Sequence, residues 1–136
     1  MSCNSQPLVL HITQDPEVIR KCTEQCPGYT CFGETVPPCF VAVCTDMRFY
    51  SLIDRHLHLV DGALGIENFL LLAHTYGIEG TILNWLHSTG RQKRVLRKLL
   101  DIPRHERVVF NMVLGHPSKA APPPGRKSVE RTYKLC

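Results

Sequence analysis

Two kinds of hydrophobic periodicity alternate along the chain. Short apolar runs bounded by turn residues are typical of strands, and apolar positions spaced three and four residues apart are typical of helices. The runs predict strands over residues 7–13, 39–45, 78–84 and 107–114. Helices are predicted over residues 15–26, 54–76 and 89–100. Strands that alternate with helices in this way predict a layered α+β structure.

Capping signals mark both ends of the first predicted helix. Asp15 has the side chain of an N-cap, Pro16 fits the first turn, and the Glu17 carboxylate favours the positive end of the helix dipole. Pro27 and Gly28 then stop the helix, so a loop is expected before the next strand.

The predicted helix over residues 54–76 carries apolar side chains on all sides from Phe69 to Ala73. Such a stretch predicts a helix that is buried on every side rather than one lying on a surface. Gly62 and Gly65 lower its helix propensity, which is tolerated where another backbone approaches closely. We therefore expect a long buried helix in the centre of the structure.

The last part of the chain differs in composition from the rest. From Ser118 onward it is rich in proline and basic residues and has no periodicity, which predicts an extended arm. With 136 residues in total, the chain is long enough for about one globular domain. The expected organisation is one domain over residues 1–117 and an arm over residues 118–136.

The formal net charge of +4 is concentrated in one predicted helix. Its basic residues are Arg91, Lys93, Arg94, Arg97 and Lys98. Such a run could contact phosphates, but no aromatic residues that could stack on bases lie among them. Apolar residues occupy the remaining positions, which is typical of an amphipathic helix with a solvated basic face. We expect no nucleic-acid partner.

Membrane association is also not expected. The longest helical run without charge extends from Asn68 to Ile78, 11 residues, whereas a span needs about 20. No basic region followed by an apolar core opens the chain, so no secretion signal is predicted. The expected location is cytoplasmic.

Seven cysteines are present, and five of them lie between Cys22 and Cys44. Disulfides are not expected in a reducing compartment. Cys39 and Cys44 lie five residues apart on a predicted strand, so their side chains should point to opposite faces. This spacing favours packing thiols, with a metal or iron–sulfur site as the alternative.

Several segments, in order, resemble motifs of one protein family. Residues 2–8 (SCNSQPL) are similar to P-S-x-x-N-x-Q-P-W, and residues 68–77 (NFLLLAHTYG) to N-x-L-L-x-A-x-x-x-G. Residues 99–103 and 114–117 are similar to the family motifs L-x-I-P and L-G-Y-P, and residues 122–127 (PPPGRK) resemble the P-x-x-R sequence in the C-terminal arm of the family. Together these segments resemble the nitroreductase family of FMN-dependent oxidoreductases.

The resemblance implies a nitroreductase-like layered fold, with a central, mostly antiparallel sheet flanked by helices and a long buried helix at an interface. It further implies an intertwined homodimer that binds FMN between its subunits. A hydride would pass from NAD(P)H through the flavin to a small acceptor such as a nitro compound or a quinone. Because the cofactor carries the reaction, the resemblance implies no catalytic side chain and no metal.

The residues that the resemblance places at the cofactor are Ser2, Asn4, Gln6, Asn84, Trp85 and Arg126. Ser2 and Asn4 would contact the flavin from one subunit, with Gln6 as a neighbour. Asn84 and Trp85 fall where the family directs backbone N–H groups at the flavin N5 region, although Trp85 could equally be a core or interface anchor. Arg126 would reach the phosphate, and Lys127 could substitute for it.

One departure from the family pattern concerns the phosphate. Family members begin with further helices that carry an R-x-S-x-R motif, whose cationic side chains hold the flavin phosphate. This chain starts at the counterpart of P-S-x-x-N, so we expect that stretch to be lacking, through truncation, divergence or because the chain is a fragment. The alternatives to an active flavoenzyme are a dimerising or binding module that has lost flavin, and a Cys-rich metal or iron–sulfur protein.

Overall fold

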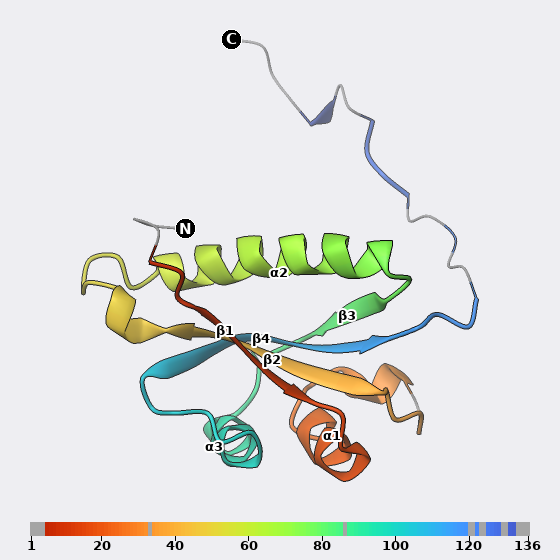
Figure 1. Cartoon of the computed structure of the whole chain (residues 1–136), viewed down its shortest axis with the longest axis horizontal. Helices are drawn as coiled ribbons and strands as arrows, with labels where there is room; N and C mark the ends of the chain where they lie inside the picture. Colours follow the sequence, from red (N-terminus) through yellow and green to blue (C-terminus); the bar gives the residue numbers. More distant parts are fainter. Residues whose placement is uncertain are drawn as a thin grey trace.

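The computed structural model describes residues 5–32, 34–85, 87–119, 122, 125–128 and 131–132. Within them the strands are β1 (Leu8–Thr13), β2 (Cys39–Asp46), β3 (Glu79–Leu83) and β4 (Glu106–Gly115). The α-helices are α1 (Pro16–Thr23), α2 (Leu57–Thr75) and α3 (Gly90–Leu99), and η2 (Tyr29–Phe32) and η3 (Met47–Phe49) are 3₁₀ turns (Figure 1). All predicted helices and strands are thereby confirmed, with ends displaced by a few residues.

The strands form one antiparallel sheet in the order β1-β2-β4-β3. β2 and β4 occupy its centre, and β1 and β3 form its two edges. The register between β2 and β4 shifts after the Val43–Phe110 pair, because Cys44 pairs with Val108 and Val109 is left as an extra residue. This β-bulge changes which β4 side chains share a face with Cys44.

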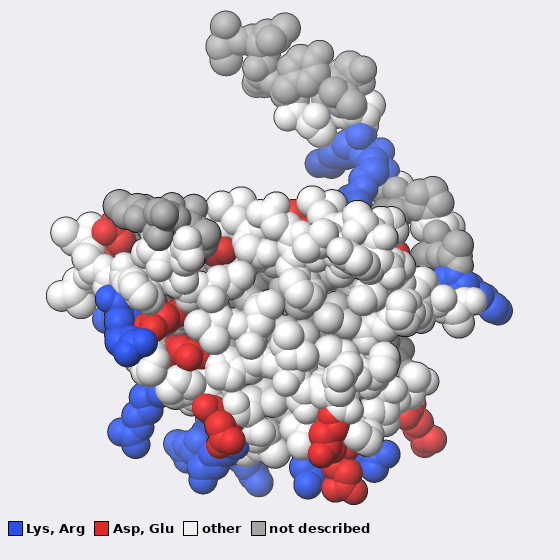
Figure 2. All heavy atoms as spheres, viewed as in Figure 1, with Lys and Arg blue, Asp and Glu red and all other residues white. Residues whose placement is uncertain are grey.

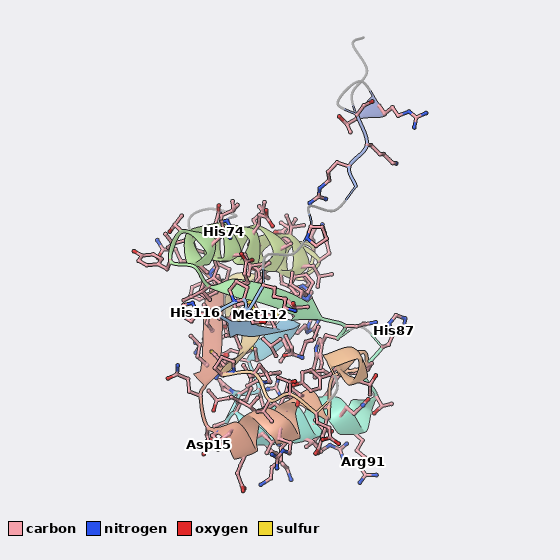
Figure 3. The ribbon with its side chains drawn as sticks, turned by 90° about the vertical axis from the view of Figure 1, so that its right-hand side faces the viewer. Asp15, His74, His87, Arg91, Met112 and His116 are labelled. Carbon is pink, nitrogen blue, oxygen red and sulfur yellow. The ribbon has the colours of Figure 1, made fainter. Side chains whose placement is uncertain are left out.

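Helices cover both faces of the sheet. α2 lies along one face, and α1 and α3 lie side by side against the other (Figure 1). Figure 3 shows the same three layers from the side, with His74 on α2, Met112 in the sheet, and Asp15 and Arg91 at the far layer. The predicted α+β layered structure is confirmed.

Two hydrophobic cores fill the spaces between these layers. Phe40, Ala42 and Cys44 of β2 pack in the core shared with α1 and α3. The alternate residues Val41 and Val43 pack in the core under α2. Cys39 packs against that second core, so it faces away from Cys44, as the strand periodicity predicts.

The predicted N-cap of the first helix is present. Asp15 Oδ1 accepts hydrogen bonds from the backbone N–H groups of Glu17 at 2.8 Å and Val18 at 3.2 Å. The helix ends at Thr23, three residues earlier than predicted, and a turn closed by the hydrogen bond from Cys26 N to Thr23 O leads away from it. Cys26 stays buried beyond the helix end.

The outer side of α2 corrects the expectation that this helix is buried on every side. Leu71 and Leu72 are each 60% exposed, and Val60 and Leu64 on the same helix are exposed as well. Among the described residues, only the sheet packs against α2, so they cover only the inner side of this helix. Burial of the outer side requires a surface that the described residues do not supply.

The two glycines of α2 were expected to allow another backbone to approach closely. In the structure, side chains of the same chain lie next to them instead. A Cβ at Gly62 would lie 2.8 Å from Cγ1 of Val109 in β4. A Cβ at Gly65 would lie 2.7 Å from Cδ2 of Leu8 in β1. Both glycines therefore allow α2 to lie close to its own sheet.

Charge is distributed unevenly over the surface. On the face seen in Figure 2, charged atoms gather along the layer of α1 and α3, and the surface over α2 is largely uncharged. The described residues after β4 lead away from the sheet toward the α2 side of the molecule (Figure 1). Among the residues that the structure describes, no helix has both the length and the apolar character needed to cross a bilayer.

Candidate functional site

Four of the residues that the resemblance places at the cofactor lie in the described part of the chain. These are Gln6, Asn84, Trp85 and Arg126. Ser2 and Asn4 fall outside the described residues. The four occupy three separate places: the start of β1, the end of β3 and the C-terminal arm.

Asn84 and Trp85 follow directly after edge strand β3. The side-chain amide of Asn84 is exposed and donates a hydrogen bond from Nδ2 to Nδ1 of His87 at 2.8 Å. Trp85 is only 6% exposed and packs in the core shared with α1 and α3. Trp85 is thus part of the core, and it also lines the surface described next.

Two adjoining hollows meet at Trp85 and Val109, and we call them together the Trp85 groove. The first has a volume of about 250 Å³ and mainly apolar walls, which include Ile82 and Phe110. The second, of about 350 Å³, is lined by Trp85 and Val109 together with basic and imidazole side chains. Those side chains belong to His58, Lys93, Arg97 and Arg107.

The cationic groups of the groove have different partners. Lys93 Nζ lies 5.9 Å from the centre of the Trp85 ring, within reach of a cation–π interaction. Arg97 donates to the backbone carbonyl oxygens of Ile102 at 3.2 Å, of Glu106 at 2.7 Å, and of Pro103. These bonds anchor the guanidinium of Arg97 to the segment that leads into β4.

The expectation that the whole basic run of α3 forms a solvated face is wrong for Lys93 and Arg97. Both are half-buried, because they flank Leu96, the fully buried residue of the helix. Their spacing of four residues places them on one side of α3, next to its apolar face. That spacing was the signal available in the sequence, whereas the contact with Trp85 depends on the tertiary fold.

Gln6 lies at the opposite edge of the sheet. It precedes β1 with a positive φ of 49° and lines a cavity of about 450 Å³ together with Gly65 and Asn68 of α2. Strands β2 and β4 separate β1 from β3. One chain therefore does not bring Gln6 together with Asn84 and Trp85. Arg126 is exposed in the arm beyond β4.

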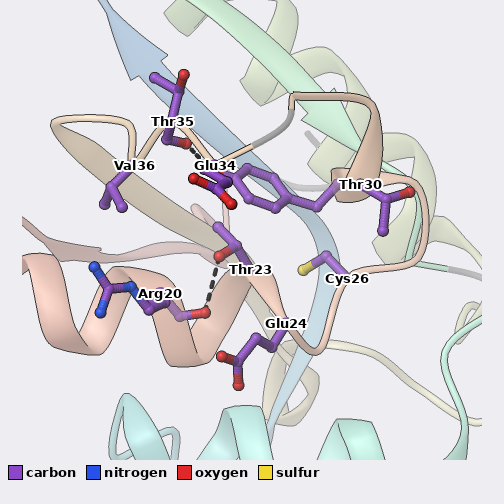
Figure 4. Close-up of a pocket in the computed structure, with 9 residues that line it drawn as sticks. Arg20, Thr23, Glu24, Cys26, Thr30, Glu34, Thr35 and Val36 are labelled. Carbon is purple, nitrogen blue, oxygen red and sulfur yellow. Dashed lines mark hydrogen bonds between the residues drawn. The ribbon is translucent and has the colours of Figure 1, made fainter.

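A further cavity, of about 500 Å³, lies between α1 and the loop that follows it (Figure 4). Thr23 Oγ1 at its wall donates to the Arg20 carbonyl at 2.9 Å, and Tyr29 Oη donates to the Thr35 carbonyl at 2.5 Å. None of the residues predicted at the cofactor lines it.

The described cysteines support the prediction of packing thiols. Cys22, Cys26 and Cys44 are buried, and burial raises the pKa of each thiol to about 12. A thiol with so high a pKa stays protonated at neutral pH and is a poor nucleophile. Cys26 Sγ accepts a hydrogen bond from Asn111 Nδ2 at 3.4 Å, which ties the turn after α1 to the sheet.

Comparison with known proteins gives matches at the level of structure. No protein-family model and no curated protein matches the sequence. A Parabacteroides distasonis protein, provisionally described as an NADH dehydrogenase/NAD(P)H nitroreductase, superimposes with a TM-score of 0.80 at 19% identity. That superposition covers 98% of this chain and 76% of the other.

Two further solved structures show the same likeness. The nitroreductase family protein of Streptococcus pneumoniae gives a TM-score of 0.79 at 16% identity, over 97% of this chain and 80% of that one. The NADPH:FMN oxidoreductase of Vibrio harveyi, in complex with NAD⁺, gives 0.72 at 20% identity, over 96% of this chain and 59% of that one. At these identities the likeness concerns the fold. The chain has the fold of nitroreductase-family proteins.

Proposed function

We propose that this chain is a subunit of an FMN-dependent oxidoreductase of nitroreductase type. The reaction would transfer a hydride from NAD(P)H to a small acceptor such as a nitro compound or a quinone. The observation that carries the proposal is the shared fold, which extends over nearly the whole chain at a TM-score of 0.80. Because a fold alone does not fix a function, the site must also fit the cofactor.

The donor set of the Trp85 groove fits a flat aromatic molecule with an anionic end. Its apolar hollow offers hydrophobic walls to a ring system, and Asn84 at the rim offers amide hydrogen bonds. The neighbouring hollow offers the cationic groups of Lys93 and Arg107 to an anion. When bound, FMN supplies the hydride-transfer chemistry, and the protein side chains bind and orient it.

A homodimer is part of this proposal. The exposed leucines and valine on the outer side of α2 form an apolar surface that a second copy of the chain could cover. A dimer would also resolve the separation of the two half-sites. The N-terminal residues Ser2, Asn4 and Gln6 of one subunit would meet Asn84 and Trp85 of the other.

The arm is proposed to complete the cofactor site. In this organisation residues 1–117 form the domain and residues 118–136 form the arm, with Arg126 at the flavin phosphate and Lys127 as its substitute. The described part of the arm leads toward the α2 side, where the proposed partner would lie (Figure 1). The arm could therefore reach a cofactor bound between two subunits.

The first experiment is a visible absorption spectrum of the purified chain after incubation with FMN and desalting. A retained flavin band close to one flavin per chain would support the proposal. It would also show that residues 1–136, which contain no R-x-S-x-R sequence, are sufficient to bind the flavin. A colourless protein would overturn it, and a colourless dimer would favour a flavin-free dimerising module instead.

The role of Arg126 has its own test. Arg126→Ala should weaken FMN binding by about tenfold and leave riboflavin binding unchanged, because only FMN carries the phosphate that a guanidinium would hold. Arg131→Ala, also in the arm, is the matched control and should change neither. Equal losses for both flavins would remove Arg126 from the phosphate site.

A further inference from the structure

Three side chains that commonly bind metals converge on the sheet face that α1 and α3 cover. They are His11 of β1, Cys44 of β2 and Glu106 of β4, and their candidate ligand atoms all lie within 4.8 Å of one another. The closest pair is His11 Nε2 and Glu106 Oε2, at 2.6 Å. Residues this distant in sequence come together only through the pairing of three adjacent strands.

The β-bulge in β4 creates this convergence. Directly opposed residues of an antiparallel pair share a face, and successive residues alternate. The Val43–Phe110 pair would continue as Cys44 opposite Val109, which would turn Glu106 to the other face. Because Val109 is extra, Cys44 lies opposite Val108, and Glu106 shares the face of Cys44. Bulges that redirect a side chain in this way often occur next to functional sites.

The burial of the three residues favours binding over a solvated surface cluster. Cys44 is fully buried and Glu106 is 8% exposed, whereas the side chain of His11 is 19% exposed at the sheet edge. An ion could therefore reach the cluster past His11. A thiolate, a carboxylate and a neutral imidazole would balance the charge of a divalent cation.

Neighbouring groups hold Glu106 in place. Arg97 donates to the backbone carbonyl of Glu106 at 2.7 Å, so it acts as a positioning residue for the start of β4. The imidazole of His105 lies 3.9 Å from Glu106 Oε1, the carboxylate oxygen that does not face His11. Outer groups of this kind commonly orient metal ligands.

We propose that His11, Cys44 and Glu106 form a binding site for a divalent transition metal ion, with Zn²⁺ as the best match. Mixed nitrogen, sulfur and oxygen ligands suit this ion, and three protein ligands leave a fourth position for water or another ligand. None of the three ligands lines the Trp85 groove, although Arg97, which positions Glu106, does, and the metal site does not depend on the proposed flavin chemistry.

Metal binding requires small movements of the three ligand side chains and the release of one proton from the Cys44 thiol. Zinc–ligand bonds of about 2.0–2.3 Å place tetrahedral ligand atoms roughly 3.3–3.7 Å apart. The His11–Glu106 pair would therefore open by about 1 Å, and Cys44 Sγ, which lies within 4.8 Å of both, would move inward by about 1 Å at most. The Cys44 thiol gives its proton to solvent as the sulfur binds, so affinity should fall as the pH is lowered.

The test is a titration of the full chain with Co²⁺ after treatment with EDTA and removal of the chelator. Cobalt bound to a thiolate gives a charge-transfer band in the near ultraviolet, read as a difference spectrum that bound flavin does not contribute to. We expect the band to saturate at one Co²⁺ per chain and to disappear when Zn²⁺ is added. A chain that shows no such band overturns the proposal and leaves the flavin proposal untouched.

Variants identify the ligands. Cys44→Ser should abolish the band, and Glu106→Gln and His11→Gln should each weaken Co²⁺ binding at least tenfold, because even outer-shell changes commonly cost that much. Cys39→Ser is the matched control, since Cys39 lies on the same strand but packs against the other core. It should leave the titration unchanged.

Circular dichroism of each variant separates loss of binding from loss of fold. If Cys44→Ser does not fold, the two glutamine variants decide. Unchanged affinity in both overturns the proposal. A band that survives in folded Cys44→Ser, or that is lost in folded Cys39→Ser, also overturns it, since the thiolate ligand would then be a different cysteine.

Discussion

Gly62 of α2 lies directly against Val109 of β4, so that a Cβ at position 62 would fall 2.8 Å from Val109 Cγ1 and 3.1 Å from Cγ2. Val109 is the extra residue of the bulge in β4 and is almost fully buried. A β-branched side chain in such a place has little freedom to rotate away. The close approach of α2 to the sheet therefore depends on the missing side chain at position 62.

Gly62→Ala is expected to destabilise the protein. Replacing glycine within a helix gains up to about 1 kcal/mol of helix propensity, whereas overpacking a core costs about 1–3 kcal/mol. The rigid contact with Val109 should make the second effect larger, so the urea midpoint should fall. Urea unfolding followed by circular dichroism measures it.

Gly65→Ala is the matched comparison in the same helix. The atom that a Cβ would meet there is the end of the Leu8 side chain, at 2.7 Å, and Leu8 is only half-buried. A flexible leucine can turn aside, so this variant should be close to neutral or slightly stabilising. If both variants lost equal stability, the rigidity of Val109 would not explain the loss in Gly62→Ala.

Asn111 carries a buried amide oxygen without a hydrogen-bond partner among the described residues. Its side chain is fully buried, Nδ2 donates to Cys26 Sγ at 3.4 Å, and Oδ1 accepts no hydrogen bond from the part of the chain that the structure describes. A buried polar group left unpaired costs about 1–3 kcal/mol. Asn111→Leu, which keeps the branched shape and the number of side-chain heavy atoms, should therefore leave the free energy of unfolding unchanged or raise it by about 1 kcal/mol.

The contrasting variant is Asn111→Asp. A carboxylate at this position would be buried without a cationic partner, and we expect a loss of several kcal/mol at neutral pH. Urea unfolding of both variants gives the comparison. A marked loss of stability in Asn111→Leu would mean that the amide oxygen is hydrogen-bonded in solution.

Asp46 and Arg48 predict how stability depends on pH. The Arg48 guanidinium donates to Asp46, with Nη2 at 2.6 Å from Oδ2, and this hydrogen bond holds the pKa of the Asp46 carboxyl below its usual value. A carboxyl whose pKa is lower in the folded protein than in the unfolded chain stabilises the folded state above its unfolded pKa, which is near 4 for Asp. This stabilisation is lost as the pH falls through the pKa of the carboxyl in the folded protein.

Arg48→Gln should therefore be less stable than the original chain at pH 6, and the difference should shrink as pH falls below about 4. Urea unfolding at a series of pH values tests this. Arg94→Gln, an exposed arginine on α3, is the control and should give a difference that does not depend on pH. A constant difference for Arg48→Gln would exclude the Asp46 carboxyl as its source.

The helices and strands could be predicted because local signals set their limits. Asp15 caps α1, and its side chain marks the start of this helix in the sequence. The run from Phe40 to Cys44 is apolar at every position, as expected for a central strand whose alternate residues pack in two different cores. The layered fold follows from such periodicities. The sequence did not predict which neighbour each strand would pair with, and the family resemblance implied only a central, mostly antiparallel sheet.

The candidate sites depended more strongly on tertiary structure. Trp85 could be singled out in the sequence, but its contact with Lys93 arises only when α3 returns to the sheet. The sequence did not indicate Glu106 as a site residue, because the direction of its side chain depends on the bulge at Val109, opposite Val43 and Cys44. A pattern of alternating residues cannot reveal such a shift, since the shift inverts the pattern from that point onward.

The outer side of α2 provides the decisive prediction for assembly. Leu64 and Leu71 are 54% and 60% exposed on one helix, and an uncovered apolar surface of this kind is typical of a protein interface. The original chain should be a dimer by light scattering. Leu71→Glu should make it a monomer, because a buried carboxylate at the interface would have no partner.

The variant should remain folded, since Leu71 contributes little to the core of its own subunit. Arg94→Glu, a charge reversal on the opposite layer, should leave the dimer intact. Because the proposed cofactor site needs residues from both subunits, FMN should be lost together with the dimer in Leu71→Glu and retained in Arg94→Glu. If Leu71→Glu is a monomer that still binds FMN, the whole cofactor site lies within one subunit. If Leu71→Glu remains a dimer, the interface lies on a surface other than the outer side of α2.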